Sequence, residues 1–338
     1  MIITHVDSET TWRGGQQSLL TLARGLRELG HHQTIVCPAN SALAARSADD
    51  GFAVADTISR TGDIVHAHSG RAQNQAYRAT VGSDVKRVVT RHVAFAPRHR
   101  LIHRLKYTYT CDGIIAVSNA VRTTLIDAGI GADKIHVIHT GIEIPTELPT
   151  QEQRSIARQH FGLIENAFVV GHIGAFTKEK GQRTVVAAAR ALQASLPHLR
   201  FLLAGDGPLR DELRAQAPTH VLFPGFVEDR ALFYAALDLF VMPSTSEAWG
   251  LAALEAMAYG VPVIASDIGG LREIVVDGVS GWLVAAEDEA AWSSKIAAIG
   301  AEPEKLANVQ IAGRRRAEQF SITRMAEQTE ALYRSVFG

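Results

Sequence analysis

The feature that most constrains this chain is a repeated alternation of short apolar runs with amphipathic segments of helix length. In the first half the strand-length runs are IITHV, QTIVC, DIVHAH, RVVTRH, GIIAVS and KIHVIH. The pattern starts again in the second half with FVVGHIG, RFLLAG, VLFPG, LFVMP and PVIAS. Strands that alternate with helices predict parallel sheets with helices on both faces. We therefore expect an α/β protein with two doubly wound halves.

The length of 338 residues suits two domains. Between the halves, Pro145 and Pro149 interrupt a polar stretch that fits neither pattern. The closing amphipathic segment can pack on either domain, and we expect it on the amino-terminal one. The predicted parts are an amino-terminal domain (1–145), a linker (146–153), a second domain (154–318) and a carboxy-terminal helix (319–338).

Composition excludes several classes of protein. The 34 basic residues balance 35 acidic ones, so no attraction to nucleic acid is expected. Cys37 and Cys111 are isolated, without a C-x-x-C motif, which favours a reducing compartment and hence the cytoplasm. The sequence opens directly on an apolar strand, and it contains no uninterrupted apolar run of about 18 residues. We expect neither a signal peptide nor a membrane-spanning helix.

Ligands of parallel α/β sheets bind beyond the carboxyl ends of the strands, and two such domains that face one another form a cleft. Gly14 and Gly15 follow the first strand and precede a helix, where backbone N–H groups can approach a phosphate. An ordinary tight turn is an equally good interpretation. Gly205 and Gly207 begin like a dinucleotide fingerprint but lack its third glycine. A nicotinamide cofactor is therefore disfavoured.

Two lysines and two glutamates in the second half are candidate ligand-binding residues. Lys178 and Lys180 lie between a strand and a helix, where an ammonium group can meet a phosphate, although such residues are often only solvated surface. Glu247 follows the strand LFVMP, and Glu255 lies among apolar residues of the next helix. A carboxylate in apolar surroundings needs a partner. A vicinal diol can supply two hydrogen bonds, and a buried salt bridge to an arginine such as Arg272 is the alternative.

These residues belong to longer motifs that carry a family resemblance. The motifs of the second half are the E-x7-E pair of Glu247 and Glu255, the KG pair of Lys180 and Gly181, GDGPLRDEL, and PVIASDIGGLREIVVDGVSGWLV. Those of the first half are RGGQQSLLTLARGLRELGHHQTIVCP, DIVHAHS and IIAVSNAVRTTL. The sequence resembles the family 4 retaining glycosyltransferases of the GT-B fold, in which two Rossmann-like domains face an interdomain cleft.

The resemblance implies a role for each matching position. Glu255 would bind the ribose hydroxyls of a nucleotide sugar, Glu247 the hydroxyls of the transferred sugar, and Lys180 the diphosphate. His92, at the end of RVVTRH, would hydrogen-bond the donor sugar and help to position the reaction, whereas a lone strand-end histidine is more often structural. The other implied donor-binding residues are Gly14, Gly15, Trp249, Gly250, Leu251 and Ala252, with Phe226 and Val227 near the nucleobase.

The sequence departs from the family pattern at two places. Ala175 stands where an arginine is usual, so one diphosphate cation is missing, and Lys178 is the candidate replacement. His139, Thr140 and Gly141 stand where an asparagine-glycine pair is common.

No metal or other cofactor is expected. His66 and His68 lie on one face of a predicted strand, but no third ligand follows at a diagnostic spacing. The sequence also lacks the D-x-D pair of metal-dependent sugar transferases, in agreement with the metal independence that the resemblance implies.

The segment KRVVTRHVAFAPRHRLIHRLKY combines basic and apolar residues. It predicts a surface for an anionic acceptor or a phospholipid headgroup layer, against the alternative of a solvated helix face. Membrane association would be peripheral, at the inner face of the plasma membrane. The basic residues of this predicted surface are Arg91, Arg98, Arg100, Arg104 and Lys106.

From the residues and the resemblance together we expect a metal-independent, retaining glycosyltransferase of the hexosyltransferase type. It would move a sugar from a nucleoside diphosphate sugar to a hydroxyl of a saccharide or glycolipid, in the synthesis of cell-envelope polysaccharide or lipopolysaccharide. One alternative is a nucleotide-sugar 2-epimerase of the same fold. Another is a catalytically idle nucleotide-sugar-binding subunit, which Ala175 suggests.

Overall fold

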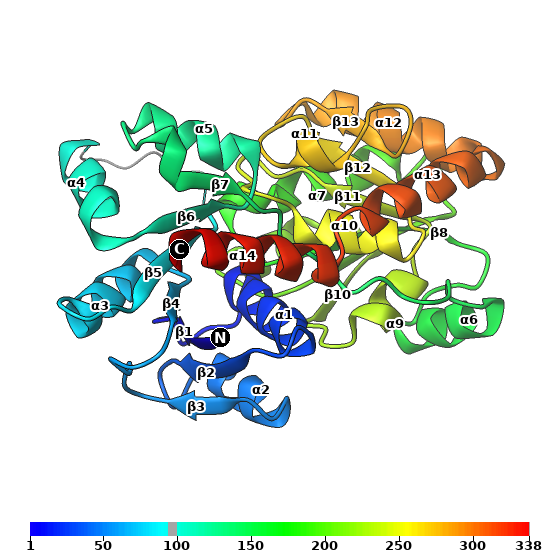
Figure 1. Ribbon diagram of the computed structural model, residues 1–338. Helices are drawn as coiled ribbons and strands as arrows, with labels where there is room; N and C mark the ends of the chain where they lie inside the picture. The colour runs from blue at the N-terminus through cyan, green and yellow to red at the C-terminus, as the bar shows by residue number, and fades with distance from the viewer. Residues whose placement is uncertain (94–99, 338) are drawn as a thin grey trace. The chain divides into compact units, whose positions relative to one another are not determined.

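The computed structural model describes residues 1–93 and 100–337. The chain divides into two compact units, of which unit 1 is Met1–Ile142 with Phe320–Gly338 and unit 2 is Glu143–Gln319. The predicted linker 146–153 lies within unit 2, where Arg314 donates a hydrogen bond of 2.6 Å to the carbonyl oxygen of Pro145. Each unit is an α/β layer structure of its own (Figure 1).

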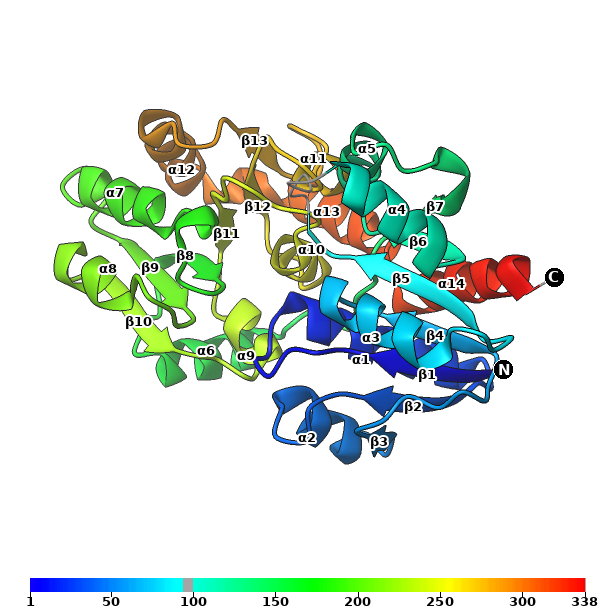
Figure 2. The ribbon, with the colours of Figure 1, turned by 90° about the vertical axis from the view of Figure 1, so that its left-hand side faces the viewer.

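Unit 1 is built on a seven-stranded sheet with the strand order β3-β2-β1-β4-β5-β6-β7, in which all pairings are parallel. Figure 2 shows β1 between β2 and β4. The strands are β1 (Ile2–Val6), β2 (His32–Val36), β3 (Ala53–Ala55), β4 (Ile64–Ala67), β5 (Lys86–Arg91), β6 (Gly113–Ala116) and β7 (Ile135–Val137). The helices are α1 (Gly14–Glu28), α2 (Ala42–Asp49), α3 (Gly70–Thr80), α4 (Arg100–Thr110), α5 (Asn119–Asp127), the short η1 (Ala132–Lys134) and α14 (Ile322–Phe337).

The carboxy-terminal helix α14 belongs to unit 1 (Figure 1). Its buried residues recur at helical spacing, and Leu332 and Tyr333 join the same core as Ile3 of β1 and Leu26 of α1. The helix lies beside α1 and covers one face of the sheet. Residues from both ends of the chain therefore share one hydrophobic core.

Unit 2 contains a six-stranded sheet with the order β10-β9-β8-β11-β12-β13, again with parallel pairings. Its strands are β8 (Phe168–Ile173), β9 (Leu199–Ala204), β10 (Val221–Gly225), β11 (Leu239–Met242), β12 (Val263–Ser266) and β13 (Trp282–Val284). Its helices are α6 (Gln151–His160), η2 (Lys178–Lys180), α7 (Gln182–Leu192), α8 (Arg210–Gln216), α9 (Arg230–Ala235), α10 (Leu251–Ala258), α11 (Leu271–Ile274), α12 (Glu289–Ala301), η3 (Pro303–Leu306) and α13 (Ala307–Glu318).

The central strands of unit 2 are uninterrupted apolar runs because helices cover both faces of a parallel sheet. Every residue of β8, β11 and β12 is buried. The α/β fold with two parallel sheets, predicted from the alternation, is confirmed. Two edge strands, β3 in unit 1 and β13 in unit 2, were not expected from the sequence.

In each sheet, successive strands are first added towards one edge and then, from one point on, towards the opposite edge. In unit 1 this point lies between β1 and β4, and in unit 2 it lies between β8 and β11. The loops that follow such a pair of strands diverge to opposite sides, which leaves a crevice at the carboxyl edge where ligands of α/β proteins bind. The loops after these four strands are therefore the first places to look for a site.

Among the described residues, no helix combines the length and the apolar character that a membrane span requires.

Candidate functional site

The loops after β8 and β11 bring two predicted residues together in unit 2. Lys180 ends the short helix η2 after β8, and Glu247 lies in the loop after β11. The Lys180 Nζ atom is 2.6 Å from Glu247 Oε2, and the two side chains are 27% and 13% exposed. The sequence thus predicted both members of a partly buried ion pair at the switch point, although it did not predict their contact.

Main-chain hydrogen bonds hold the loop that carries Glu247. Thr245 N donates to the carbonyl oxygen of Glu179, and Gly270 N donates to that of Glu247, at 2.8 and 3.2 Å. Gly269 has φ +46°, and a Cβ atom at this position would collide with the carbonyl oxygen of Glu247. The glycine pair that follows β12 therefore lets two backbone segments meet and fixes the place of the glutamate.

Helix α10 begins directly after this loop. Gly250 precedes it in a left-handed conformation, with φ +115°, and Leu251 and Ala252 form its first turn. N–H groups of a first turn have no acceptor within the helix, and they lie at the positive end of the helix dipole. The side chain of Trp249 is buried, so only the backbone of that residue can serve a ligand. This helix start suits an anionic group.

Glu255 lies one turn further along α10 and is 9% exposed. Its Oε2 atom accepts a hydrogen bond of 2.8 Å from the hydroxyl of Tyr234. Burial, and then the negative charge of Glu255, raise the pKa of Tyr234 well above its usual value, so this hydroxyl stays protonated. Arg272 instead pairs with Asp267 at 2.5 Å. Arg272, the arginine named as an example for a buried salt bridge with Glu255, therefore has its carboxylate partner elsewhere.

Tyr234 was missed by the sequence analysis. It lies in α9 and is fully buried, in a segment, RALFYAAL, whose pattern indicated only an apolar helix. The signal that could have drawn attention to it is the need of a buried tyrosine hydroxyl for a hydrogen-bond partner.

Phe226 and Val227 follow β10 at the same edge of the sheet. The Phe226 ring is 58% exposed, which is unusual for a large aromatic side chain, and Val227 is half-buried. An exposed ring offers a flat face for stacking. Their contact with a nucleobase stays a prediction.

The loop that contains Ala175 is fixed from inside the unit. Gln182 Nε2 donates to the carbonyl oxygen of Ala175 at 2.8 Å and lies 3.1 Å from Nε2 of His172. Since Val241 O can only accept, His172 donates to it through Nδ1, and its Nε2 atom accepts. Lys178, the candidate replacement for the missing arginine, is exposed in η2.

In unit 1 the structure brings His92 next to the start of α1. A Cβ atom added to Gly15 would lie 3.9 Å from Cδ2 of His92, so the ring sits over the first turn that Gly14 opens. Burial lowers the pKa of His92 to about 4. Its Nε2 atom is buried and has no hydrogen-bond partner among the described residues. A neutral imidazole beside a helix start can bind a hydroxyl group or an anion.

Three other histidines of unit 1 form a cluster that the sequence analysis did not foresee. His5 of β1 joins His66 and His68, and one ring nitrogen of each lies within 4.8 Å of the others. The third imidazole was missed because it is far away in sequence. It becomes a neighbour through the parallel register that pairs His5 with His66.

Hydrogen bonds within the protein already occupy most of these ring nitrogens. Gln33 Nε2 donates to Ala23 O, so Gln33 Oε1 accepts from His5 Nε2 at 2.9 Å. The Nδ1 atom of His5 then accepts from Nε2 of His68 at 3.1 Å. Both nitrogens of His66 are engaged as well, by Tyr333 and Thr90. The cluster is thus bonded as a polar core, and the absence of a metal requirement stays a prediction.

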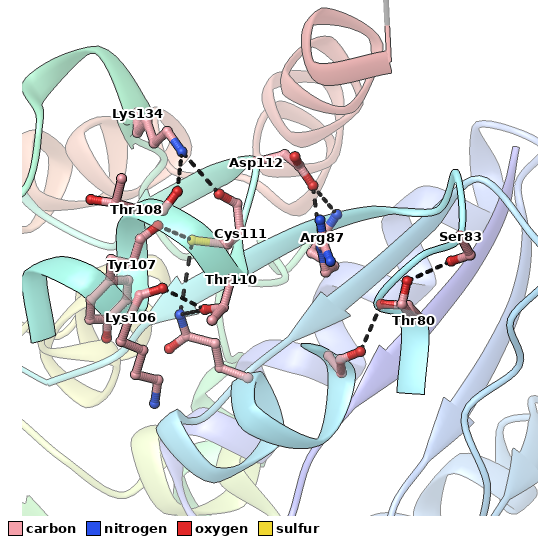
Figure 3. A network of polar contacts seen from close by, with 12 residues as sticks. Thr80, Ser83, Arg87, Lys106, Tyr107, Thr108, Thr110, Cys111, Asp112 and Lys134 are labelled. Atoms are coloured by element: carbon pink, nitrogen blue, oxygen red, sulfur yellow. Dashed lines mark hydrogen bonds and ion pairs between the residues drawn. The ribbon is translucent and has the colours of Figure 1, made fainter. Parts of the chain in front are cut away.

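Part of the basic segment is used internally (Figure 3). Arg87 pairs with Asp112 through its backbone N–H at 2.8 Å and its Nε at 3.6 Å. Lys106 Nζ donates to the carbonyl oxygen of Gly70 at 2.7 Å. Tyr107 is 2% exposed, so its predicted place on the surface is wrong. The side of α4 that carries Tyr107 faces the interior of unit 1.

Among the described side chains of α4, several are exposed. They include Arg104, Leu105 (56% exposed) and Tyr109 (69% exposed). Arg91 ends β5 and is half-buried. Arg98 lies outside the described residues, and Arg100 is described only by its backbone at the start of α4.

Two family models match the chain. The model of glycosyl transferases group 1 matches residues 153–316, within unit 2, and the model of glycosyltransferase family 4 matches residues 59–144. The first match therefore includes Lys180, Glu247 and Glu255, and the second includes His92 and the strand that precedes it.

Two curated relatives are similar over most of this chain. Alpha-maltose-1-phosphate synthase of Mycobacterium tuberculosis is 29% identical over 330 residues, which span 88% of this chain and 84% of that protein. D-inositol 3-phosphate glycosyltransferase of Geodermatophilus obscurus is 31% identical over 309 residues, which span 80% of this chain and 66% of that protein.

Solved structures share the fold. HepE of Anabaena, in complex with UDP, superposes with a TM-score of 0.90 at 24% identity and covers 99% of this chain and 100% of its own. Sucrose-phosphate synthase of Thermosynechococcus elongatus gives a TM-score of 0.80 at 21% identity, with 99% of each chain covered. Together with the family models, these likenesses place the chain among the family 4 glycosyltransferases of the GT-B fold.

Proposed function

We propose that this enzyme transfers a glycosyl group from a nucleoside diphosphate sugar to a hydroxyl of a saccharide or glycolipid, without a metal ion and with retention of anomeric configuration. The solved HepE complexes contain UDP, UDP with glucose, and UDP-glucose, which supports a donor of this class. Synthesis of cell-envelope saccharide, at the cytoplasmic face of the membrane, is part of the same proposal.

One arrangement carries the proposal. Glu247 and Glu255 lie on either side of the start of α10, and Lys180 contacts the first of them. A nucleotide sugar has hydroxyl groups at both ends and a diphosphate between them. Carboxylates accept hydrogen bonds from hydroxyl groups, and a helix start with a lysine beside it favours the diphosphate. The order of these groups along unit 2 therefore matches the order of groups along the donor.

In the proposed reaction the bond between the anomeric carbon and the diphosphate oxygen breaks, and the acceptor oxygen bonds to that carbon from the same face. The departing phosphate takes the proton of the acceptor hydroxyl, so no strong protein base is needed. Negative charge develops on the diphosphate as the bond loosens. Lys180 and the N–H groups at the start of α10 stabilise that charge, and stabilisation of this kind is typically the largest part of such catalysis.

Unit 1 supplies His92 in this proposal. Its imidazole is neutral at physiological pH because burial lowers its pKa to about 4. A neutral ring can hydrogen-bond a sugar hydroxyl without bringing a positive charge to the reacting carbon. Gly14 and Gly15 leave the start of α1 open next to it.

The test is a donor and acceptor screen. UDP-, GDP-, ADP- and dTDP-sugars are incubated with the enzyme in the presence and in the absence of a panel of saccharide and glycolipid acceptors. Each incubation is repeated in EDTA. We expect one donor to release its nucleoside diphosphate only when an acceptor is present, equally fast in EDTA. NMR of the product should show the anomeric configuration of the donor.

Other results would overturn the proposal. Formation of an epimer of the sugar nucleotide without acceptor would indicate the 2-epimerase. Tight binding of a nucleotide sugar without turnover of any acceptor would indicate a binding subunit.

A further inference from the structure

Glu255 meets a second residue of unit 2 that neither the family motifs nor the sequence pattern single out. Tyr234 lies on α9, and its hydroxyl oxygen is 2.8 Å from Glu255 Oε2 and 3.0 Å from the carbonyl oxygen of Ala252. Both oxygens are acceptors, and the phenol has one proton to donate. The shorter contact, to the charged carboxylate, is the stronger of the two, so the proton is directed mainly at Glu255.

Several contacts fix the position of the Tyr234 ring. It is fully buried, stacks on Tyr259 with 5.4 Å between ring centroids, and meets Phe240 edge-on at 5.9 Å. Helix α9 itself begins with a side-chain cap, since Asp229 accepts a hydrogen bond of 2.9 Å from Leu232 N. A ring held in this way cannot follow a moving carboxylate, so the hydroxyl acts as a fixed reference point.

The hydroxyl remains a donor at any physiological pH. Burial raises the pKa of Tyr234 well above its usual value, and the negative charge of Glu255 raises it further. The pKa of Tyr259 is raised by the same two causes. Hydrogen bonds that end on a charged acceptor are stronger than neutral ones, so this contact restrains Glu255 strongly.

We propose that Tyr234 is a positioning residue for the nucleotide: it holds the Glu255 carboxylate in the rotamer that grips the ribose diol. This inference rests on the proposed function, because Glu255 is assigned there to the ribose. A carboxylate that binds two neighbouring hydroxyl groups must present its oxygens at the right angle. A change of the Glu255 rotamer would weaken that contact without touching the diphosphate or the sugar.

The test separates positioning from simple structural support. Calorimetry first measures the binding of UDP, GDP and ADP to the wild type. The best binder and its 2′-deoxy and 3′-deoxy analogues are then titrated into the wild type and into Tyr234→Phe. The variant keeps the ring and removes only the hydroxyl. We expect the parent nucleotide to bind the variant about tenfold more weakly, which corresponds to about 1.4 kcal/mol. The deoxy analogues should lose much less, so that the preference for an intact ribose shrinks.

Tyr259→Phe is the matched control, because it removes a tyrosine hydroxyl from the neighbouring stacked ring. It should leave the preference for the intact ribose unchanged. With a donor sugar in hand, Tyr234→Phe should raise KM and leave kcat within about twofold of the wild type.

An equal loss of affinity for the nucleotide and its deoxy analogues would overturn the positioning role and leave only a structural one. Unchanged affinity in Tyr234→Phe would overturn it as well. If the wild type binds none of these three ribonucleoside diphosphates, the assignment of Glu255 to a ribose diol fails first, and the inference falls with it.

Discussion

Lys180 and Glu247 form an ion pair in unit 2, with 2.6 Å between Nζ and Oε2. The pair joins the loop after β8 to the loop after β11, so a cation and a carboxylate are held in place before any ligand arrives. An incoming diphosphate would share the ammonium group with Glu247. Preorganised charges of this kind favour charge development during a reaction, because they need no rearrangement.

Substitution of Lys180 by methionine removes the cation and keeps most of the side-chain volume. We expect kcat to fall by about 10²–10³-fold, since loss of a single stabilising group in a transition state costs that much. Steady-state kinetics with a saturating donor measure the effect. Lys295→Met, on α12, is the control and should keep full activity. A Lys180→Met variant as active as this control would rule out a role for Lys180 in the charge stabilisation.

Substitution of Glu255 by alanine should weaken nucleotide binding by about 10–100-fold, as expected for the loss of hydrogen bonds to a charged group. The fold should persist because α10 is otherwise apolar and well packed. Calorimetry gives the affinity, and circular dichroism reports the fold. Glu212→Ala, which breaks an exposed pair with Arg183, serves as the reference. Equal affinities for both variants would speak against the ribose assignment.

Introduction of an arginine at Ala175 restores the cation that the family pattern contains. We expect the affinity for the best-binding nucleoside diphosphate to rise by about 3–10-fold through contact with the diphosphate. Ala301→Arg, at the exposed end of α12, adds the same charge elsewhere in unit 2. The comparison of the two by calorimetry separates a local contact from a change in net charge. No gain over Ala301→Arg would mean that position 175 does not face the diphosphate.

Substitution of Gly269 by alanine should destabilise unit 2 and displace the Glu247 loop. The backbone has φ +46°, and the new methyl group would collide with the carbonyl oxygen of Glu247. We expect a loss of about 2–4 kcal/mol in the free energy of unfolding, measured with urea. Gly278 also has a positive φ, of +70°, but an added Cβ atom would have no neighbour within 4 Å. Gly278→Ala should therefore lower the free energy of unfolding by only about 1–2 kcal/mol. Equal losses would show that the contact with the loop is relieved at little cost.

The stability of the protein should depend on pH because its buried histidines are neutral. Burial lowers the pKa of His5 and of His172 to about 4, whereas an unfolded histidine has a pKa of about 6.5. Below 6.5 the unfolded chain binds more protons than the folded one. The free energy of unfolding should therefore be constant above pH 6.5 and fall towards pH 4, by up to about 3 kcal/mol for each residue.

Urea titrations between pH 7.5 and 4.5 measure this dependence. His5→Gln, which removes one of the titrating groups, should show a smaller decrease over the same range. A free energy of unfolding that stays constant down to pH 4.5 in the wild type would contradict the neutral state of these histidines.

Much of the fold follows from the sequence for a simple reason. Parallel strands that are buried on both faces must be apolar throughout, so β8 and β11 stand out as short hydrophobic runs. The edge strand β3 escapes this rule, because it has only three residues and two of them are exposed. Edge strands lack the burial that makes a strand visible in a sequence.

The candidate site was predictable to a different extent. Glu247 and Lys180 were found from motifs and strand ends, but their contact depends on the order β8-β11, which no local pattern contains. His5 and Tyr234 were missed for the same reason. Each meets its partner through an element that is distant in sequence, and the residue itself carries only a strand or helix pattern.

The return of α14 to unit 1 has a consequence for folding during synthesis on the ribosome. The two places where the chain passes between the units lie side by side, since Ile142 N donates to Phe320 O at 3.0 Å and Ile322 N to Ile142 O at 3.2 Å. The core around Leu26 and Ile3 is closed by Leu332 and Tyr333, which follow unit 2 in the chain. Unit 1 can therefore complete this core only after the whole of unit 2 has been synthesised, whereas unit 2 takes its residues from one continuous stretch.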